Sequence, residues 1–357
     1  MLRLLTTLLL VLFVTATSGA DDSEHHTCKR EKSDVYDDTK YHIFNSPDAI
    51  YPIKYKLGIK YGSKYEVEHF LGIIRFDSPN WDVINWHMSH YTNKPEYMHC
   101  VDAGGNFGFF SLHMAAWGCK VSTFDIQPAM TEVELYQSYT NNYNHGHMHV
   151  YRVGLSDKPS TMRFENEEGY AFLAPGSSQS GSSAGGVDVP VMTGDLCLHK
   201  RKMALVKIDV EGFEVRTVNG MRGLISEGFI EGFHIEIGPA RWDRANLTTQ
   251  AGVDMLMENL SKKYHVNLIL RNSDTCVGKI FSGFESKTSN KYDLTNGNHL
   301  VPIDWSDFSA LMHNMVKFEN DCNFYFSPWT MPEEIAKQPL FQQRFAALEG
   351  KVIMKGM

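Results

Sequence analysis

The stretch VDAGGNFG, residues 101–108, follows an apolar run and contains three glycines beside one acidic and one amide side chain. Glycines let a backbone approach a bound molecule closely, which is typical of cofactor loops. A dinucleotide fingerprint needs glycine at its first, third and sixth positions. Counted from Gly104, the third and sixth positions are Asn106 and Phe109. The loop therefore argues against a nicotinamide or flavin oxidoreductase.

The spacing from Asp102 through Gly104 and Asn106 to Gly108 suits a ligand without a pyrophosphate, such as S-adenosylmethionine. Asp102 can accept a hydrogen bond from the ammonium group of that ligand or from ordered water. A helix beginning near residue 109 would direct its free amide groups at the ligand's carboxylate. Asp125 ends the next predicted strand, about 20 positions beyond the loop, where nucleotide folds place an acidic residue that accepts from ribose hydroxyls. The loop and Asp125 together predict a nucleoside site.

Three segments resemble successive motifs of the FkbM-type methyltransferase family: VDAGGNFGFFSLHMAAWGCKVSTFDIQP, GLSDKPSTMRF and LVKIDVEGFEVRTVNG. The resemblance covers residues 98–270, and KIDVEGFE is its most distinctive part. It implies a class I methyltransferase fold and transfer of a methyl group from S-adenosylmethionine, commonly to a hydroxyl oxygen of a sugar or polyketide-like molecule. The family more usually has glutamate at the position of Asp125, but the shorter carboxylate can still reach a diol.

The resemblance also implies a role for each matching residue. The methionine end of the ligand would be lined by Asp102, Gly104, Asn106 and Gly108, and its ribose by Asp125. The adenine would lie beside Ser156 and Asp157, and the transferring methyl near Asp209, Glu211 and Glu214.

Methyl transfer to a hydroxyl requires a positioned base that takes the proton as the new bond forms. Lys207, Asp209 and Glu211 alternate at the end of a predicted strand, so they would share one face if the chain stayed extended. We expect Asp209 to be the base, with Glu211 as the alternative. Lys207 would hold a carboxylate ionised or orient the substrate. The competing interpretation is a structural salt-bridge cluster.

His234 and Glu236 alternate on the following predicted strand. Glu236 is a candidate to bind the acceptor or, together with Asp209, a divalent ion. His234 is explained equally well as a core histidine. The segment HGHMH, residues 145–149, contains metal-ligand residue types, but turn residues before a strand explain it as well. The sequence thus predicts S-adenosylmethionine as the cofactor and no metal.

These residues are positioned by short apolar runs that alternate with helix-length segments from residue 98 onward. The runs MHCVDAG, KVSTFDI, HVYRVGL, MALVKID and GFHIEI are typical of buried strands, and residues 109–118, 128–142 and 214–228 have helical spacing. Such alternation predicts an α/β fold with a doubly wound, mostly parallel, Rossmann-like sheet covered on both faces. Ligands of such sheets bind at the carboxyl ends of the strands, where the acidic residues named above are expected.

The predicted methyltransferase core, residues 98–270, lies between other segments. An irregular N-terminal cap is expected at 46–97, and a mobile polar lead-in at 21–45. The C-terminal extension, 271–357, should contain a last strand within 317–328 and a helical tail. Residues 167–189 are rich in glycine and serine and form either a surface loop or a lid over the site.

The first twenty residues have the plan of a secretory signal peptide, with a basic start, an apolar run and small residues up to Ala20, after which cleavage is expected. A retained Golgi-type anchor is the alternative. The apolar run is shorter than the ~20 residues that span a bilayer, and no membrane span is expected after cleavage. Asn246 and Asn259 would then be glycosylation acceptors. The six cysteines would lie in an oxidising compartment, and Cys100 and Cys119, which each begin a predicted strand, are a candidate disulfide.

The chain is 43% hydrophobic and carries a formal net charge of −8, which indicates a globular protein and argues against a nucleic-acid partner. The run HKRK, residues 199–202, is either a local basic patch or a solvated loop. Three functions stay open, with oligomeric state undetermined. The first is an O-methyltransferase of the secretory lumen or outside the cell, acting on a hydroxyl of a glycan or small molecule. The second is a secreted binding protein that keeps the fold without catalysis. The third, which the missing glycines weaken, is a nucleotide-binding oxidoreductase.

Overall fold

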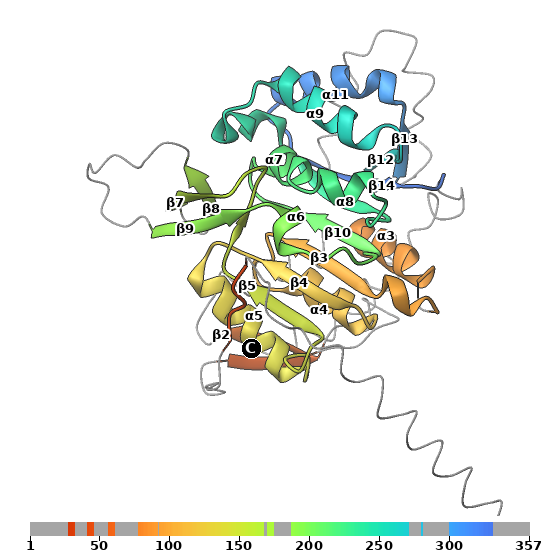
Figure 1. The fold of residues 1–357 in the computed structure, drawn as a ribbon. Helices are drawn as coiled ribbons and strands as arrows, with labels where there is room; N and C mark the ends of the chain where they lie inside the picture. Colours follow the sequence, from red (N-terminus) through yellow and green to blue (C-terminus); the bar gives the residue numbers. More distant parts are fainter. Residues whose placement is uncertain are drawn as a thin grey trace, which may run out of the picture.

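A computed structural model describes residues 28–32, 41–45, 56–60, 78–91, 93–167, 170–174, 187–270, 280 and 300–330. Its centre is an eight-stranded sheet in the order β13-β12-β14-β11-β10-β3-β4-β5 (Figure 1). Neighbouring strands from β11 to β5 run parallel. These five strands overlap the five apolar runs and confirm the mostly parallel α/β sheet: β3 (His99–Ala103), β4 (Lys120–Phe124), β5 (Met148–Tyr151), β10 (Leu205–Ile208) and β11 (Phe233–Ile237).

The strands that complete the sheet come from the C-terminal part of the chain. β14 (Cys322–Ser327) lies antiparallel between β11 and β12 (His265–Ile269), and β13 (Leu300–Ile303) pairs with β12 at the edge. All residues of β14 are buried, as expected for a strand covered on both faces. The strand predicted within 317–328 is therefore inserted into the sheet. The predicted helical tail from residue 331 lies outside the described residues.

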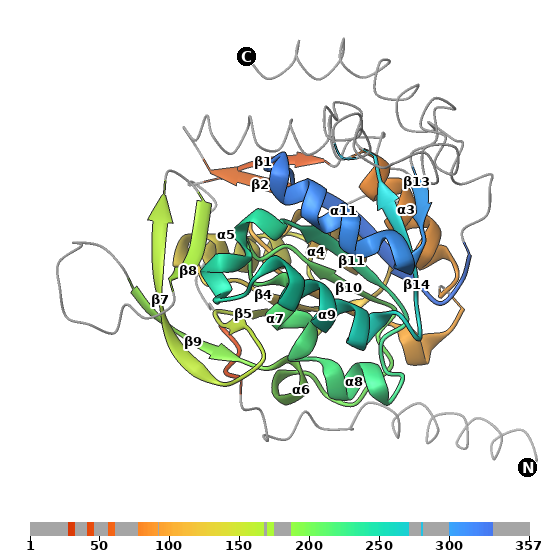
Figure 2. The same cartoon turned by 90° about the horizontal axis from the view of Figure 1, so that it is seen from above.

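Helices cover both faces of the sheet (Figures 1 and 2). The first layer comprises α3 (Ser78–Ser89), α4 (Phe109–Ala116) and α5 (Pro128–Thr140), and the second α7 (Glu214–Asn219), α8 (Arg222–Ser226), α9 (Thr249–Leu260) and α11 (Trp305–Lys317). Successive side chains of a strand point to opposite layers, since Cys100 and Leu205 pack with α3 and α4 whereas Val101 and Val206 pack with α7, α8 and α9. A two-stranded sheet, β1 (Tyr41–Asn45) with β2 (Lys56–Lys60), contacts α5.

Three elements differ from the sequence prediction. The region expected to be an irregular cap contains helix α3, with Trp81, Ile84 and Met88 buried in the core. The helix predicted over 214–228 is divided at Gly220, where a side chain would overlap the Ser156 carbonyl.

The strand predicted at 149–155 is also divided, because the chain leaves the main sheet after β5. Its second part, β6 (Gly154–Leu155), joins a four-stranded sheet with the order β6-β9-β7-β8. The other members are β7 (Ser160–Glu167), β8 (Tyr170–Ala174) and β9 (Val187–Met192). Residues 175–186 of the predicted loop or lid lie outside the described residues, so this choice stays open.

Two disulfides join distant parts of the fold. Cys100–Cys119, with Cα atoms 5.9 Å apart, confirms the candidate pair, and Cys28–Cys197 has a Cα separation of 5.2 Å. The second disulfide anchors residues 28–32, which we call the strap, and thus departs from the expected mobile lead-in. Residues 1–20 lie outside the described part of the chain. Within the described part, no helix has the length and apolar character needed to cross a membrane.

Candidate functional site

Lys207 is the centre of a buried ionic cluster at the carboxyl edge of the sheet. It lies opposite Asp102 in the parallel pair β10–β3, and its Nζ is 3.3 Å from Asp102 Oδ1 and 3.5 Å from Asp209 Oδ2. Nζ also donates to the Gly104 carbonyl at 2.9 Å and lies 5.0 Å from the centre of the Phe110 ring. Burial alone would lower the pKa of Lys207, but the two carboxylates outweigh it and raise the pKa. A charged lysine therefore ties β10 to the glycine loop.

The two carboxylates of this cluster differ in exposure. Asp102 is 0% exposed and accepts from Ser111 Oγ at 2.7 Å, whereas the Asp209 side chain is 33% exposed. Burial raises the pKa of Asp102, although Lys207 and Ser111 oppose the rise. Protein groups enclose Asp102, and its contact with a methionine ammonium or with ordered water stays a prediction. Asp209 is the member of the cluster that a bound molecule can reach.

Asp125 lies against the glycine loop, as the nucleoside-site prediction requires. Its carboxylate accepts from the backbone amides of Asn106 and Gln127, each at 2.8 Å. Burial raises the pKa of Asp125 to about 6, with these two amides opposing the rise. A carboxylate offers about four acceptor positions, so about two remain for hydroxyl donors. Helix α4 begins after Gly108 without a side-chain cap, which leaves backbone donors at the same edge.

The glycines of the loop have a structural reason that the sequence alone did not show. Gly104 has φ +81°, and a side chain there would overlap the Asp209 carbonyl. A side chain at Gly105 would overlap the Glu134 carboxylate. The amides of both glycines donate to the Phe124 carbonyl, at 2.8 and 3.2 Å. The glycines thus bring the loop against β10 and α5, whatever else they permit.

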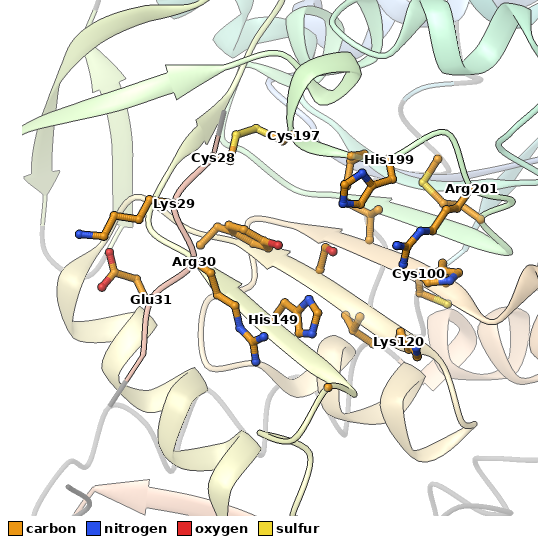
Figure 3. A pocket seen from close by; sticks show the side chains of 18 of the residues that line it. Cys28, Lys29, Arg30, Glu31, Cys100, Lys120, His149, Cys197, His199 and Arg201 are labelled. Atoms are coloured by element: carbon orange, nitrogen blue, oxygen red, sulfur yellow. A yellow bond between two sulfur atoms is a disulfide. The ribbon is translucent and has the colours of Figure 1, made fainter. Parts of the chain in front are cut away.

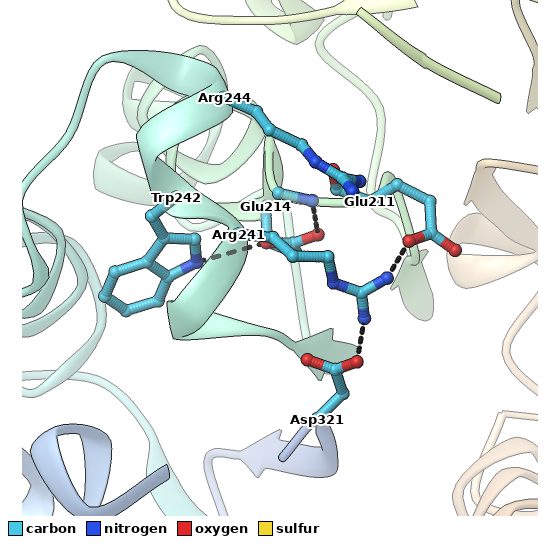
Figure 4. A network of polar contacts seen from close by, with 7 residues as sticks. Glu211, Glu214, Arg241, Trp242, Arg244 and Asp321 are labelled. Carbon is cyan, nitrogen blue, oxygen red and sulfur yellow. Dashed lines mark hydrogen bonds and ion pairs between the residues drawn. The ribbon is translucent and has the colours of Figure 1, made fainter. Parts of the chain in front are cut away.

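Glu211 leaves the face that Lys207 and Asp209 share, because the extended strand ends at Ile208 and Glu211 has φ 52°. The prediction of one common face is therefore wrong for Glu211. Its carboxylate instead pairs with Arg241, whose guanidinium also pairs with Asp321 (Figure 4).

Arg241 lies in η4 (Pro239–Ala245), which follows β11, and Asp321 directly precedes β14. The ion-pair network therefore joins the ends of three strands at the edge where the site lies. Sequence reasoning missed both residues, since no spacing links segments that are so far apart in the chain.

Glu214 makes structural contacts within the protein, and its place near a transferring methyl stays a prediction. It is 2% exposed, and its two oxygens accept from the Gly212 amide at 2.6 Å and Trp242 Nε1 at 3.1 Å (Figure 4). Burial raises the pKa of Glu214 to about 8 despite these donors. The side chain closes the turn after β10 onto η4.

His234 and Glu236 point to the side of β11 that faces α3. His234 is buried, with Nε2 3.0 Å from Asn80 Oδ1, as the core-histidine interpretation expects. Glu236 is partly exposed, and its charge contributes to the raised pKa of Lys207. Glu236 therefore belongs to the same electrostatic environment as the Lys207 cluster.

Ser156 and Asp157 follow β6 and so leave the main sheet. Asp157 forms an ion pair with Arg216 of α7 at 2.6 Å, and Ser156 is buried with its amide bonded to the Met192 carbonyl. Across the part of the chain that the structure describes, no three His, Cys, Asp or Glu side chains are arranged to hold a metal ion. Neither HGHMH nor the Asp209–Glu236 pair gains support as a metal site.

Comparison with known proteins adds one match. Residues 102–264 match the family model described as the methyltransferase FkbM domain. The match begins at Asp102 and ends before β12, so it contains every residue predicted for the site. No curated protein matches the chain significantly.

Proposed function

Since residues 102–264 match the family model of the methyltransferase FkbM domain, we propose that the protein uses S-adenosylmethionine to methylate a hydroxyl group. The acceptor would be a glycan or small molecule in the secretory pathway. One observation carries the proposal: the accessible carboxylate of Asp209 is held by buried Lys207 beside the glycine loop and Asp125. The two disulfides support an oxidising compartment, since disulfides persist there.

The residues at this edge fit a cationic methyl donor. Asp102, Asp125, Asp209 and Glu236 provide four carboxylates around the single ammonium of Lys207, which leaves an excess of negative charge. S-adenosylmethionine, when bound, supplies an electrophilic methyl group on a sulfonium. Asp125 would hold its ribose hydroxyls, and the first turn of α4 would hold its carboxylate.

Asp209 is the proposed base, because its carboxylate can accept the proton of the acceptor hydroxyl. Lys207 orients Asp209 through the ion pair and is in turn fixed by Asp102. Glu211 remains the alternative, but its pair with Arg241 would have to open first. Glu236 would contact the acceptor. Ser156 and Asp157 are proposed to border the adenine, with Asp157 fixed by α7.

Calorimetric titration of the protein with S-adenosylmethionine tests donor binding. Asp125→Asn should weaken binding about tenfold or more, because it removes charge-assisted hydrogen bonds worth roughly 1.5–3 kcal/mol. Asp195→Asn is the matched control, since Asp195 also accepts two backbone amides, at 3.0 Å from Gly223 and Leu224, away from the edge. Absence of binding, or equal losses in both variants, would refute the proposed site.

Asp209→Asn separates binding from catalysis. It should retain donor affinity and lose methylation across a panel of hydroxylated glycans and small molecules, followed with donor labelled in the methyl group. Donor binding by the unmodified protein without any methylated product would favour the alternative of a secreted binding protein.

A further inference from the structure

A large cleft lies on the sheet face opposite α4, away from the candidate active site. It has a volume of about 1200 Å³, and its floor is the amino-terminal half of β3 and β4 together with β5 (Figure 3). Residues 197–203, beginning with the end of helix α6 (Gly194–Cys197), form one wall, and the strap, residues 28–32, forms the other. The carboxyl ends of β3 and β4 carry Asp102 and Asp125, and Asp209 follows the neighbouring strand β10. The cleft is therefore a separate place on the molecule.

The cleft concentrates positive charge in an acidic protein. Among the described residues that line it, one side chain, Glu31, is acidic, and Glu31 lies 3.8 Å from Arg152. The chain as a whole carries a net charge of −8. Like charges gathered in a hollow create a local positive potential that attracts anions. The cationic side chains are Lys29, Arg30, Lys32, Lys120 and Arg201, joined by His99, His145, His149 and His199.

The strap is held in place before any ligand binds. Cys28 is bonded to Cys197, the Glu31 amide donates to the Val150 carbonyl at 2.8 Å, and Arg30 Nη2 donates to the Asn144 carbonyl at 3.3 Å. Because the strap is anchored at both ends, its basic residues lose less conformational entropy when they contact a ligand. The strap is thus a preformed wall of the cleft that carries cationic residues.

Two sequence segments that the methyltransferase chemistry does not use meet in this cleft. HGHMH, residues 145–149, contributes His145 and His149, and the basic run 199–202 contributes His199 and Arg201 (Figure 3). Lysine, arginine and charged histidine offer only hydrogen-bond donors, and arginine binds the oxygens of anionic groups strongly. Both walls of the cleft therefore suit a ligand that carries several anionic oxygens.

We propose that this cleft binds a sulfated oligosaccharide. Its volume exceeds the ~300–1,000 Å³ usual for single small ligands, so it can hold several sugar units. Among the described lining residues, Tyr151 alone is a Phe, Tyr or Trp, and it is buried, so the cleft offers little of the base stacking on large aromatic side chains that single-stranded nucleic acids use. The disulfide of the strap suits an oxidising compartment, and a sulfated glycan would supply several anionic oxygens along one chain. The site is independent of methyl transfer.

The test is calorimetric titration of the full chain with a sulfated hexasaccharide and with the unsulfated hexasaccharide of the same backbone. Lys120→Glu/Arg201→Glu should weaken binding of the sulfated ligand about tenfold or more, since it reverses two charges inside the cleft. Lys200→Glu/Lys262→Glu is the control with the same change in net charge. Lys200 adjoins Arg201 in sequence but pairs with Glu227, and neither control residue lines the cleft.

The expected result is binding of the sulfated ligand alone, strongly weakened by salt and by the cleft variant and changed less than about twofold in the control. Thermal unfolding of both variants confirms that they are folded. Equal losses in the two variants would overturn the proposal. So would equal affinity for the unsulfated sugar, a single-stranded oligonucleotide or anionic phosphatidylserine vesicles.

Discussion

Replacing Lys207 by methionine tests whether the buried ion pairs hold the glycine loop to β10. Methionine keeps much of the length of the side chain but leaves Asp102, which is 0% exposed, without its counter-charge. Removing one partner of a buried pair costs about 3–5 kcal/mol. At about 1–2 °C per kcal/mol for a chain of 357 residues, Lys207→Met should lower the melting temperature by roughly 3–10 °C.

The cost of Lys207→Met should depend on pH. Burial already raises the pKa of Asp102, and loss of the lysine raises it further. A carboxyl group with a raised pKa in the folded state stabilises that state at low pH and loses this contribution as pH rises. The free energy of unfolding of the variant should therefore approach that of the unmodified protein between pH 8 and pH 5. Urea denaturation at several pH values measures it.

Two companion variants make the result decisive. Asp102→Asn added to Lys207→Met removes the stranded charge and should recover part of the lost stability. Lys202→Met removes a half-exposed lysine 3.8 Å from Glu231 and should cost less than about 1 kcal/mol. The reasoning is refuted if Lys207→Met costs no more than Lys202→Met, or if its cost is the same at every pH.

Three further outcomes are expected. Affinity for S-adenosylmethionine should fall as pH drops through about 6, because Asp125 then takes up a proton and loses acceptor capacity; calorimetry at pH 7.5 and 5 would contradict this by finding equal affinities. Removing the disulfide of Cys28, whose partner is 169 positions away, should cost about 5 kcal/mol, against about 3 kcal/mol for that of Cys100, whose partner is 19 away. Denaturant titration of the two sets of alanine variants measures both, and the reverse order would count against this chain-entropy argument. Gly146→Ala should lower the free energy of unfolding by about 1–2 kcal/mol, because Gly146 has a positive φ. Gly104→Ala should lower it more, because the added methyl would also overlap a backbone carbonyl. Equal melting temperatures of the two variants would exclude that overlap.

The parallel strands were predictable because a strand buried on both faces is a short, nearly continuous apolar run. Helix α3 was missed although its signal was present, since Trp81, Ile84 and Met88 recur at helical spacing. The surrounding prolines and aromatic residues obscured that spacing. The place of β14 within the sheet was not predictable, because strand order depends on long-range pairing and not on local pattern.

For the candidate site, alternation along a strand placed Lys207 and Asp209 on one side correctly. The same rule failed at Glu211, because it holds only while the chain stays extended and the strand ends at Ile208. Arg241 and Asp321 form an ion pair although they lie 80 positions apart in the chain. The local sequence around each residue does not predict this contact. The convergence of residues 145–149 and 199–202 in one cleft was hidden for the same reason.

The position of β14 bears on how the protein is made. Because β14 separates β11 from β12, the sheet cannot close until residue 327 has emerged from the ribosome. Until then the apolar edge of β11 stays unpaired and open to association with other nascent chains. Biosynthesis of this protein should therefore depend on chaperones, and a chain that terminates before Cys322 should be degraded instead of reaching the native fold.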